Sequence, residues 1–225
     1  METSNNNNVM TMPRIGDTAP DFEAVTTTGK LKFSDYNKDR WVILFSHPAD
    51  FTPVCTTELS EFAREEEYFA SKNTKLMGLS IDSIHSHIAW VNNVKKNLDV
   101  TMRFPIIADI DMKVAKLYGM LQPGESETAA VRAVFFIDPK SKIRLIMYYP
   151  LNIGRSMDEI KRVLTALQTS DTNRVAMPLN WKPGDKVIVP PPKTVEEMEE
   201  RENSDYEMVD FYLAKKDIQS NAAGA

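Results

Sequence analysis

The chain holds a single cysteine, Cys55, among its 225 residues. One thiol excludes an intrachain disulfide, a Cys-x-x-Cys redox pair and a zinc site built on cysteines. Disulfides are rare in reducing compartments, so the cysteine count leads us to expect a cytoplasmic protein. Any thiol chemistry of this chain must therefore begin at Cys55.

Several other features are missing as well. Lys and Arg number 27 against 32 Asp and Glu, and no basic tract interrupts the net charge of −5, so we expect no nucleic-acid partner. No apolar run approaches the roughly 20 residues that cross a bilayer, and we expect no membrane insertion. Residues 1–12 are polar, lack a signal-peptide pattern and are expected to form a loose tail, with Met10 or Met12 as alternative starts.

Strand-like and helix-like segments alternate between residues 13 and 170. This alternation predicts an α/β domain with a mostly parallel or mixed sheet flanked by helices. Residues 41–45 are continuously apolar, as in a central strand buried on both faces. The other expected elements are helices at 58–73, at 83–96 and from Ser156, and strands at 75–82, 131–137 and 143–149, the last two as a hairpin.

The composition changes after about residue 170, and we expect residues 171–225 to form a second, smaller domain. A proline-stiffened stretch ends at Pro192, and a short acidic helix is expected at 194–202. An apolar cluster follows at residues 206–213, too large for a free tail to leave exposed. The cluster must pack on the first domain or on a second subunit.

Cys55 is expected in the first turn of a helix that follows the apolar strand. Thr52 suits the N-cap and Pro53 the first helical position, so Cys55 would be the third helical residue, near free backbone N–H groups. The helix dipole favours a thiolate there by only ~0.3–1 kcal/mol, too little without a fixed cation. The alternative is that Cys55 is merely a small buried hydrophobic residue.

Arg132 is the candidate for that cation. Strand alternation in 131–137 places it on the same face as Val134 and Phe136, where a buried guanidinium needs an anionic partner. At about 4 Å and an effective dielectric constant near 20, its attraction to a thiolate is on the order of 4 kcal/mol before desolvation. An edge arginine that reaches solvent is the alternative.

His47 lies at the end of the apolar strand, on the loop that leads to the cysteine. There it is a candidate to orient a substrate, although a histidine at a strand end is more often structural. His85 and His87 are two residues apart on an expected helix and do not share a face. With one cysteine in the chain, we expect no metal site.

The segment around the cysteine resembles the active-site motif of a known family. Pro48-x-x-x-Thr52-x-x-Cys55 is similar to that of the peroxiredoxins, and Ser46-His-Pro-Ala-Asp-Phe-Thr-Pro-Val-Cys-Thr-Thr-Glu58 resembles their 1-Cys, peroxiredoxin-6-like subfamily. The likeness continues through Ile81-Asp-Ser, Phe104-Pro-Ile-Ile, Tyr118-Gly-Met-Leu, Val131-Arg-Ala-Val-Phe-Phe-Ile-Asp, Tyr149-Pro, Ile153-Gly-Arg-Ser and Asn180-Trp-Lys-Pro-Gly-Asp.

The resemblance implies a thioredoxin-like core with a central mixed sheet, and a C-terminal domain that helps to form a homodimer; larger assemblies are left open. It implies a thiol-dependent peroxidase that reduces hydrogen peroxide or organic hydroperoxides. The matching positions assign roles as follows: Cys55 is the peroxidatic cysteine, Thr52 and Arg132 hold the thiolate and the peroxide oxygens, Pro48 shields the site, and His47 and Arg155 support it.

The single cysteine also defines the expected cycle. Attack on a peroxide gives a sulfenic acid at Cys55, and an external thiol must resolve it, with no bound cofactor. Residues 25–31 lack the serine motif of some relatives, so a phospholipase activity is not expected. The competing function is a peroxide sensor or chaperone-like oligomer that is switched by oxidation of Cys55.

We predict that deletion of residues 171–225 disrupts the dimer, because it removes the apolar cluster at 206–213. Light scattering coupled to gel filtration should give the mass of a dimer for the full chain and of a monomer for the truncated one. A truncated protein that remains dimeric would contradict the assignment of the interface to this region.

Overall fold

The computed structural model describes residues 12–218, which divide into two compact units, one ending at Arg155 and one beginning at Ser156. The boundary lies before helix α6 (Met157–Asn173), whereas the change in composition places it after that helix. The reason is the packing at the end of α6. Ala166 packs against the apolar cluster around Trp181, and the Ser170 hydroxyl donates to the Val175 carbonyl at 2.7 Å.

The first unit is built on a seven-stranded sheet with the order β2-β1-β5-β4-β3-β6-β7. β3 pairs in parallel with β4 and antiparallel with β6, so the sheet is mixed, as expected. The strands are β1 (Glu23–Thr26), β2 (Gly29–Lys32), β3 (Trp41–Ser46), β4 (Thr74–Ser80), β5 (Ile106–Ala108), β6 (Arg132–Ile137) and β7 (Ile143–Tyr149).

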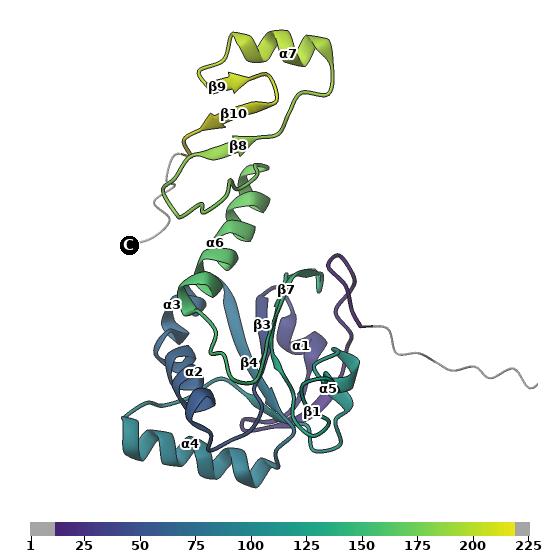
Figure 1. The fold of residues 1–225 in the computed structure, drawn as a ribbon, viewed down its shortest axis with the longest axis vertical. Helices are drawn as coiled ribbons and strands as arrows, with labels where there is room; N and C mark the ends of the chain where they lie inside the picture. Colours follow the sequence, from purple (N-terminus) through teal and green to yellow (C-terminus); the bar gives the residue numbers. More distant parts are fainter. Residues whose placement is uncertain (1–11, 219–225) are drawn as a thin grey trace, which may run out of the picture. The chain divides into compact units, whose positions relative to one another are not determined.

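Helices cover both faces of this sheet. Figure 1 shows α2, α3 and α4 together on one side and α1 and α5 on the other. The bounds are α1 (Phe33–Asn37), α2 (Pro53–Arg64), α3 (Glu66–Ser71), α4 (Ile84–Leu98) and α5 (Lys113–Leu117). The helix expected at 58–73 is therefore two helices, because Glu65 adopts φ −93° and ψ 5° and ends the first of them.

The central strand β3 is buried at every position, which confirms the prediction from its continuous apolar run. Val42 and Leu44 belong to the core cluster on the side of α1 and α5. Phe45 points to the other face and stacks on Phe62 of α2, with ring centroids 3.9 Å apart. Side chains that alternate between two covered faces explain why the strand reads as an unbroken apolar run.

The hairpin of β6 and β7 is also confirmed, and a buried amide fixes its turn. Asn37, fully buried at the end of α1, donates from Nδ2 to the carbonyls of Arg40 and Asp138 at 2.7 and 3.2 Å. Its Oδ1 accepts from the Ser141 hydroxyl at 2.6 Å. One side chain thereby ties the turn to the start of β3.

The second unit consists of α6 and a three-stranded antiparallel sheet with the order β8-β10-β9. Its elements after α6 are β8 (Val187–Val189), α7 (Val195–Glu202), β9 (Glu207–Asp210) and β10 (Leu213–Lys216). Arg201 of α7 is buried and donates to the carbonyls of Phe211 and Pro190. The acidic helix expected at 194–202 is confirmed, with Thr194 as its N-cap.

Three members of the apolar cluster at 206–213, Val209, Phe211 and Tyr212, are 68, 44 and 55 % exposed in the single chain. Among residues 12–218, no helix combines the length and the apolar character that a bilayer crossing requires.

We predict that Asn37→Ala lowers the free energy of unfolding by about 2 kcal/mol, because two carbonyls and a hydroxyl lose their buried partner. Denaturant unfolding followed by circular dichroism measures the change. Asn92→Ala, at an exposed position of α4, is the control and should change stability by less than about 0.5 kcal/mol. Equal stability of the two variants would show that the amide does not fix the turn.

Candidate active site

The loop that follows β3 leads directly into the helix that carries the thiol. The His47 N–H donates to the Leu79 carbonyl at 2.9 Å, so the chain stays beside β4 for one more residue. Helix α2 then begins at Pro53 with Thr52 as its N-cap, which confirms Cys55 as the third helical residue. Its side chain is fully buried.

Arg132, the first residue of β6, reaches the sulfur atom. Phe45 pairs with Val134, so the start of β6 meets the end of β3 and Arg132 projects toward α2. Its Nη1 donates to Cys55 Sγ at 3.3 Å, and the residue is only 2 % exposed. The alternative of an edge arginine that reaches solvent is therefore wrong.

Glu58 is the anionic partner of this arginine. Its carboxylate accepts from Arg132 Nη1 at 2.7 Å and from Nη2 and Nε of Arg155 at 2.7 and 2.9 Å. The Arg155 backbone N–H also donates to Glu58 at 2.7 Å. All three side chains are at most 5 % exposed. Arg155 thus lies in the same hydrogen-bonded network as Arg132, and the support role that the family resemblance implies for it stays a prediction.

The charges of this network are unequal. Two guanidinium groups face one carboxylate, which leaves one positive charge uncompensated next to the thiol. Burial alone would raise the pKa of Glu58, but the hydrogen bonds and charge of Arg155, with the charge of Arg132, hold the pKa below its usual value. An anion next to Arg132 would balance the buried charge.

Arg132 keeps part of its hydrogen-bonding capacity. Its Nε and Nη2 donate to the Leu151 carbonyl at 3.0 and 2.7 Å, and its Nη1 serves both Glu58 and Cys55. These contacts use four of the five N–H groups of a guanidinium. One N–H of Nη2 is left for a ligand oxygen.

Thr52 does not use its side chain as a helix cap. Its hydroxyl donates to the Ala49 carbonyl at 2.8 Å, so its oxygen lone pairs stay available as acceptors. Pro48 is partly buried within the same loop. The roles that the family resemblance gives to Thr52 and Pro48 stay predictions.

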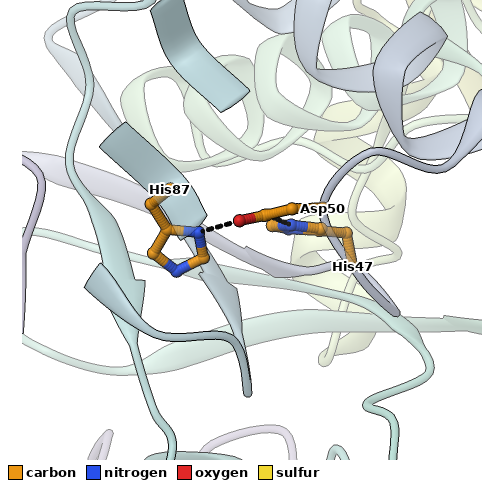
Figure 2. Close-up of side chains that lie close together, drawn as sticks. All are labelled: His47, Asp50 and His87. Carbon is orange, nitrogen blue, oxygen red and sulfur yellow. Dashed lines mark hydrogen bonds and ion pairs between the residues drawn. The ribbon is translucent and has the colours of Figure 1, made fainter. Parts of the chain in front are cut away.

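His47 is fully buried, and its partners are residues that the sequence did not single out for the site. Figure 2 shows Asp50 between two imidazoles: Oδ1 lies 3.0 Å from His47 Nε2, and Oδ2 lies 2.8 Å from His87 Nδ1. Burial tends to raise the pKa of Asp50, but the hydrogen bonds and charges of both histidines hold the pKa far below its usual range. Burial lowers the pKa of His47, and the hydrogen bond and charge of Asp50 oppose that effect.

Sequence reasoning missed Glu58, Asp50 and His87. Glu58 follows Cys55 by three residues, the spacing of neighbours on one helix face, and that spacing could have placed it at the site. Asp50 is three residues from His47 in the same loop. His87 gave no such signal, because α4 meets this loop only in the folded chain.

The arrangement suits attack by a sulfur anion on a small polar molecule. Donors of Arg132 lie beside Sγ, and the N–H of Cys55 is in the first helical turn, where no intrahelical carbonyl accepts it. Preorganised donors of this kind stabilise negative charge that develops on an oxygen atom.

Comparison with known families and proteins agrees with this chemistry. Residues 15–146 match the AhpC/TSA family, and residues 166–204 match the C-terminal domain of 1-Cys peroxiredoxin. A peroxiredoxin of Methanosarcina mazei is 53% identical over 218 residues, which cover 92% of this chain and 100% of the relative. A peroxiredoxin of Aquifex aeolicus is 50% identical over 220 residues, 93% of this chain and 99% of the relative.

Solved structures are similar over the same extent. A yeast mitochondrial 1-Cys peroxiredoxin, studied for thiol resolution through glutathione/thioredoxin systems, has a TM-score of 0.82 at 42% identity and covers 92% of this chain and 100% of its own. A cysteine-to-serine mutant of the peroxiredoxin 6 of Arenicola marina has a TM-score of 0.83 at 39% identity, covering 91% and 98%. The thioredoxin-like fold is thereby confirmed.

We predict that the stability of the protein falls as the pH drops below the ordinary glutamate value of 4.5, in part through Glu58. A carboxyl whose pKa is lower in the folded than in the unfolded state stabilises the fold above its unfolded pKa and loses that effect as it becomes protonated. Glu58→Gln should cost about 3 kcal/mol at pH 7, because two buried cations lose their counterion. Between pH 7 and pH 3.5, the free energy of unfolding, measured with denaturant, should fall less for this variant than for the wild type.

Glu61→Gln, at a more exposed position of the same helix, is the matched control. It should follow the wild-type pH dependence. An identical pH dependence in the Glu58 variant would contradict the role of this carboxylate.

Proposed function

The chain belongs to the AhpC/TSA family, in its 1-Cys peroxiredoxin branch, and is a thiol-dependent peroxidase; from this premise we propose that Cys55 is the residue that reduces the peroxide. The observation that carries the assignment is the 3.3 Å contact between Arg132 Nη1 and Cys55 Sγ. At this separation and an effective dielectric constant near 20, the attraction to a thiolate is on the order of 5 kcal/mol before desolvation.

The reaction begins when the thiolate attacks one oxygen of the hydroperoxide. The S–O bond forms as the O–O bond breaks, Cys55 becomes a sulfenic acid, and the departing oxygen takes up a proton to give water or an alcohol. Negative charge grows on that oxygen during the step. The spare N–H of Arg132 and the N–H of Cys55 are the donors that we assign to it.

Thr52 and Pro48 complete the proposed site. The lone pairs of the Thr52 hydroxyl oxygen, whose proton goes to Ala49, can accept the O–H of a hydroperoxide. Pro48 has no N–H and forms part of the loop that separates the buried thiol from water. Arg155 has no direct contact with the sulfur among the described residues; we propose that it acts by holding Glu58, and through Glu58 the position of Arg132.

The second half of the cycle requires a thiol from another molecule, because the chain has one cysteine. That thiol attacks the sulfenic sulfur, water leaves, and a further thiol releases Cys55 from the mixed disulfide. The yeast relative is resolved through glutathione/thioredoxin systems, and we propose a reductant of this class here. No bound cofactor enters the proposed cycle.

We propose that the protein works as a cytoplasmic homodimer. The apolar side chains of Val209, Phe211 and Tyr212, which the second unit does not bury by itself, favour an interface there. The chemistry at Cys55 favours an enzyme over a sensor. A sensor needs a reactive thiol, whereas this site also provides donors for the oxygen atoms of a substrate.

We predict that one equivalent of hydrogen peroxide adds one oxygen atom to Cys55 and that the peroxide disappears at the same rate. The Cys55→Ser variant should neither gain an oxygen atom nor consume the peroxide. Arg132→Met should slow the reaction by about a hundredfold or more, because it removes both the counterion of the thiolate and an oxygen donor. Stopped-flow kinetics measures the rate of peroxide loss, and the intact mass of the protein shows the added oxygen atom.

Arg103→Met, at an arginine whose side chain is 71% exposed, controls for the loss of an arginine as such. Oxidation of the wild type no faster than that of a free cysteine would refute the assignment of Cys55, and an unchanged rate in Arg132→Met would refute the role of Arg132. Turnover sustained by added thiol distinguishes an enzyme from a sensor, which would oxidise once and change its assembly.

A further inference from the structure

His47, Asp50 and His87 form a buried chain of hydrogen bonds that ends on the backbone of β5. His87 Nε2 lies 3.0 Å from the Ile107 carbonyl, and its Nδ1 lies 2.8 Å from the Asp50 carboxyl group. A carbonyl oxygen can only accept, so Nε2 of His87 carries a hydrogen. The protonation of the other atoms follows from the state of Asp50.

Each oxygen of the buried Asp50 carboxyl group faces one imidazole nitrogen, at 3.0 and 2.8 Å, an arrangement that stabilises the ionised carboxylate and holds the pKa of Asp50 below its usual range. An ionised carboxylate can only accept. His87 Nδ1 therefore carries a second hydrogen, which makes His87 an imidazolium, and Nε2 of His47 carries one as well. The positive charge of His87 balances the charge of the buried Asp50.

His47 is then neutral, in agreement with the lowering of its pKa by burial, and its Nδ1 is a bare lone pair. Within residues 12–218, this buried atom has no hydrogen-bond partner. A buried acceptor without a donor costs free energy, so the site is prepared for a molecule that brings a donor.

A metal ion is the other occupant that this group of side chains suggests, since the three donor atoms lie within 4.8 Å of one another. Two ligands of a tetrahedral zinc ion lie about 3.4 Å apart, given bonds of about 2.0–2.1 Å. The two contacts of Asp50 are shorter, at 2.8 and 3.0 Å, which are hydrogen-bond lengths. The positive charge of Arg155 also acts on His47 and opposes a divalent cation. Hydrogen bonds rather than metal coordination therefore account for these contacts.

His47, which carries the unpartnered nitrogen, directly follows Ser46. The Ser46 carbonyl accepts a hydrogen bond from Arg155 at 2.9 Å. Arg155 binds Glu58, and Glu58 binds the arginine that touches the thiol. His47 and Cys55 are both fully buried, so a ligand that reaches both groups has to be small. A hydroperoxide is small and carries an O–H donor.

We propose that Asp50 and His87 are positioning residues that keep His47 neutral and protonated at Nε2, so that its Nδ1 accepts one O–H of hydrogen peroxide and leaves the other O–H for Thr52. The inference rests on the proposed function and adds two residues to it. Asp50 acts by orienting the imidazole and increasing its strength as an acceptor, and His87 acts as the counterion of Asp50.

Asp50→Asn tests the proposal with little change of shape. The amide oxygen of asparagine can accept from His47, and its NH₂ group can donate to His87, which then becomes neutral. Each hydrogen bond and the net charge are retained, while the carboxylate that strengthens His47 as an acceptor is lost. His85→Gln, at an exposed histidine of the same helix as His87, is the control.

Two reactions of the thiol are compared in each protein. Hydrogen peroxide brings an O–H donor to the site, whereas iodoacetamide alkylates a thiolate without one. We expect Asp50→Asn to slow oxidation about tenfold or more, to change alkylation less than twofold, and His85→Gln to change neither. Oxidation within twofold of the wild type in Asp50→Asn, or equal slowing of both reactions, would overturn the proposal.

A measurement on the wild type needs no variant. Nitrogen-15 spectra of the reduced protein should show His47 with hydrogen on Nε2 only and His87 with hydrogen on both nitrogens. Hydrogen on Nδ1 of His47 would overturn the proposal. Failure of the proposed function looks different, because the wild type would then react with peroxide no faster than a free cysteine.

Discussion

The site depends on one buried carboxylate that accepts hydrogen bonds from two arginines at once. Glu58 accepts from Arg132 and Arg155, and both cations are almost completely removed from water. A single pair of opposite charges would be neutral and would offer nothing to an anion. The second guanidinium gives the site an excess positive charge 3.3 Å from Cys55 Sγ, and the proposed thiolate is the anion that would balance it.

The pairing of β3 with β6 makes this arrangement possible. The antiparallel register places the start of β6 beside the end of β3, where the loop to α2 begins. Arg132 and Cys55 are 77 residues apart in the chain, yet each is at the first turn or first residue of its element. Rigid elements therefore hold both groups, and little freedom has to be lost when a substrate binds.

A second polar cluster joins the loop before α2 to helix α4, and in it too one buried carboxylate has two partners. Asp50 has two partners, as Glu58 does, but its partners are histidines rather than arginines. The loop is also held by its backbone, because the Asp50 N–H donates to Asp82 at 3.0 Å. The residue after it, Phe51, has a φ of 55°, a left-handed conformation that a bulky side chain adopts only when its surroundings impose it.

The sequence alone determined the local features: the buried strand β3, the start of α2 at Pro53, the position of Cys55 in its first turn and the need for an external thiol. These follow from signals within a few residues, namely an apolar run, a capping residue and a count of cysteines. Only the tertiary structure decided the partners of the charged groups. Glu58 and Arg155 are separated by 97 residues and Asp50 and His87 by 37, so their contacts depend on strand register and helix packing, which leave no local trace in the sequence.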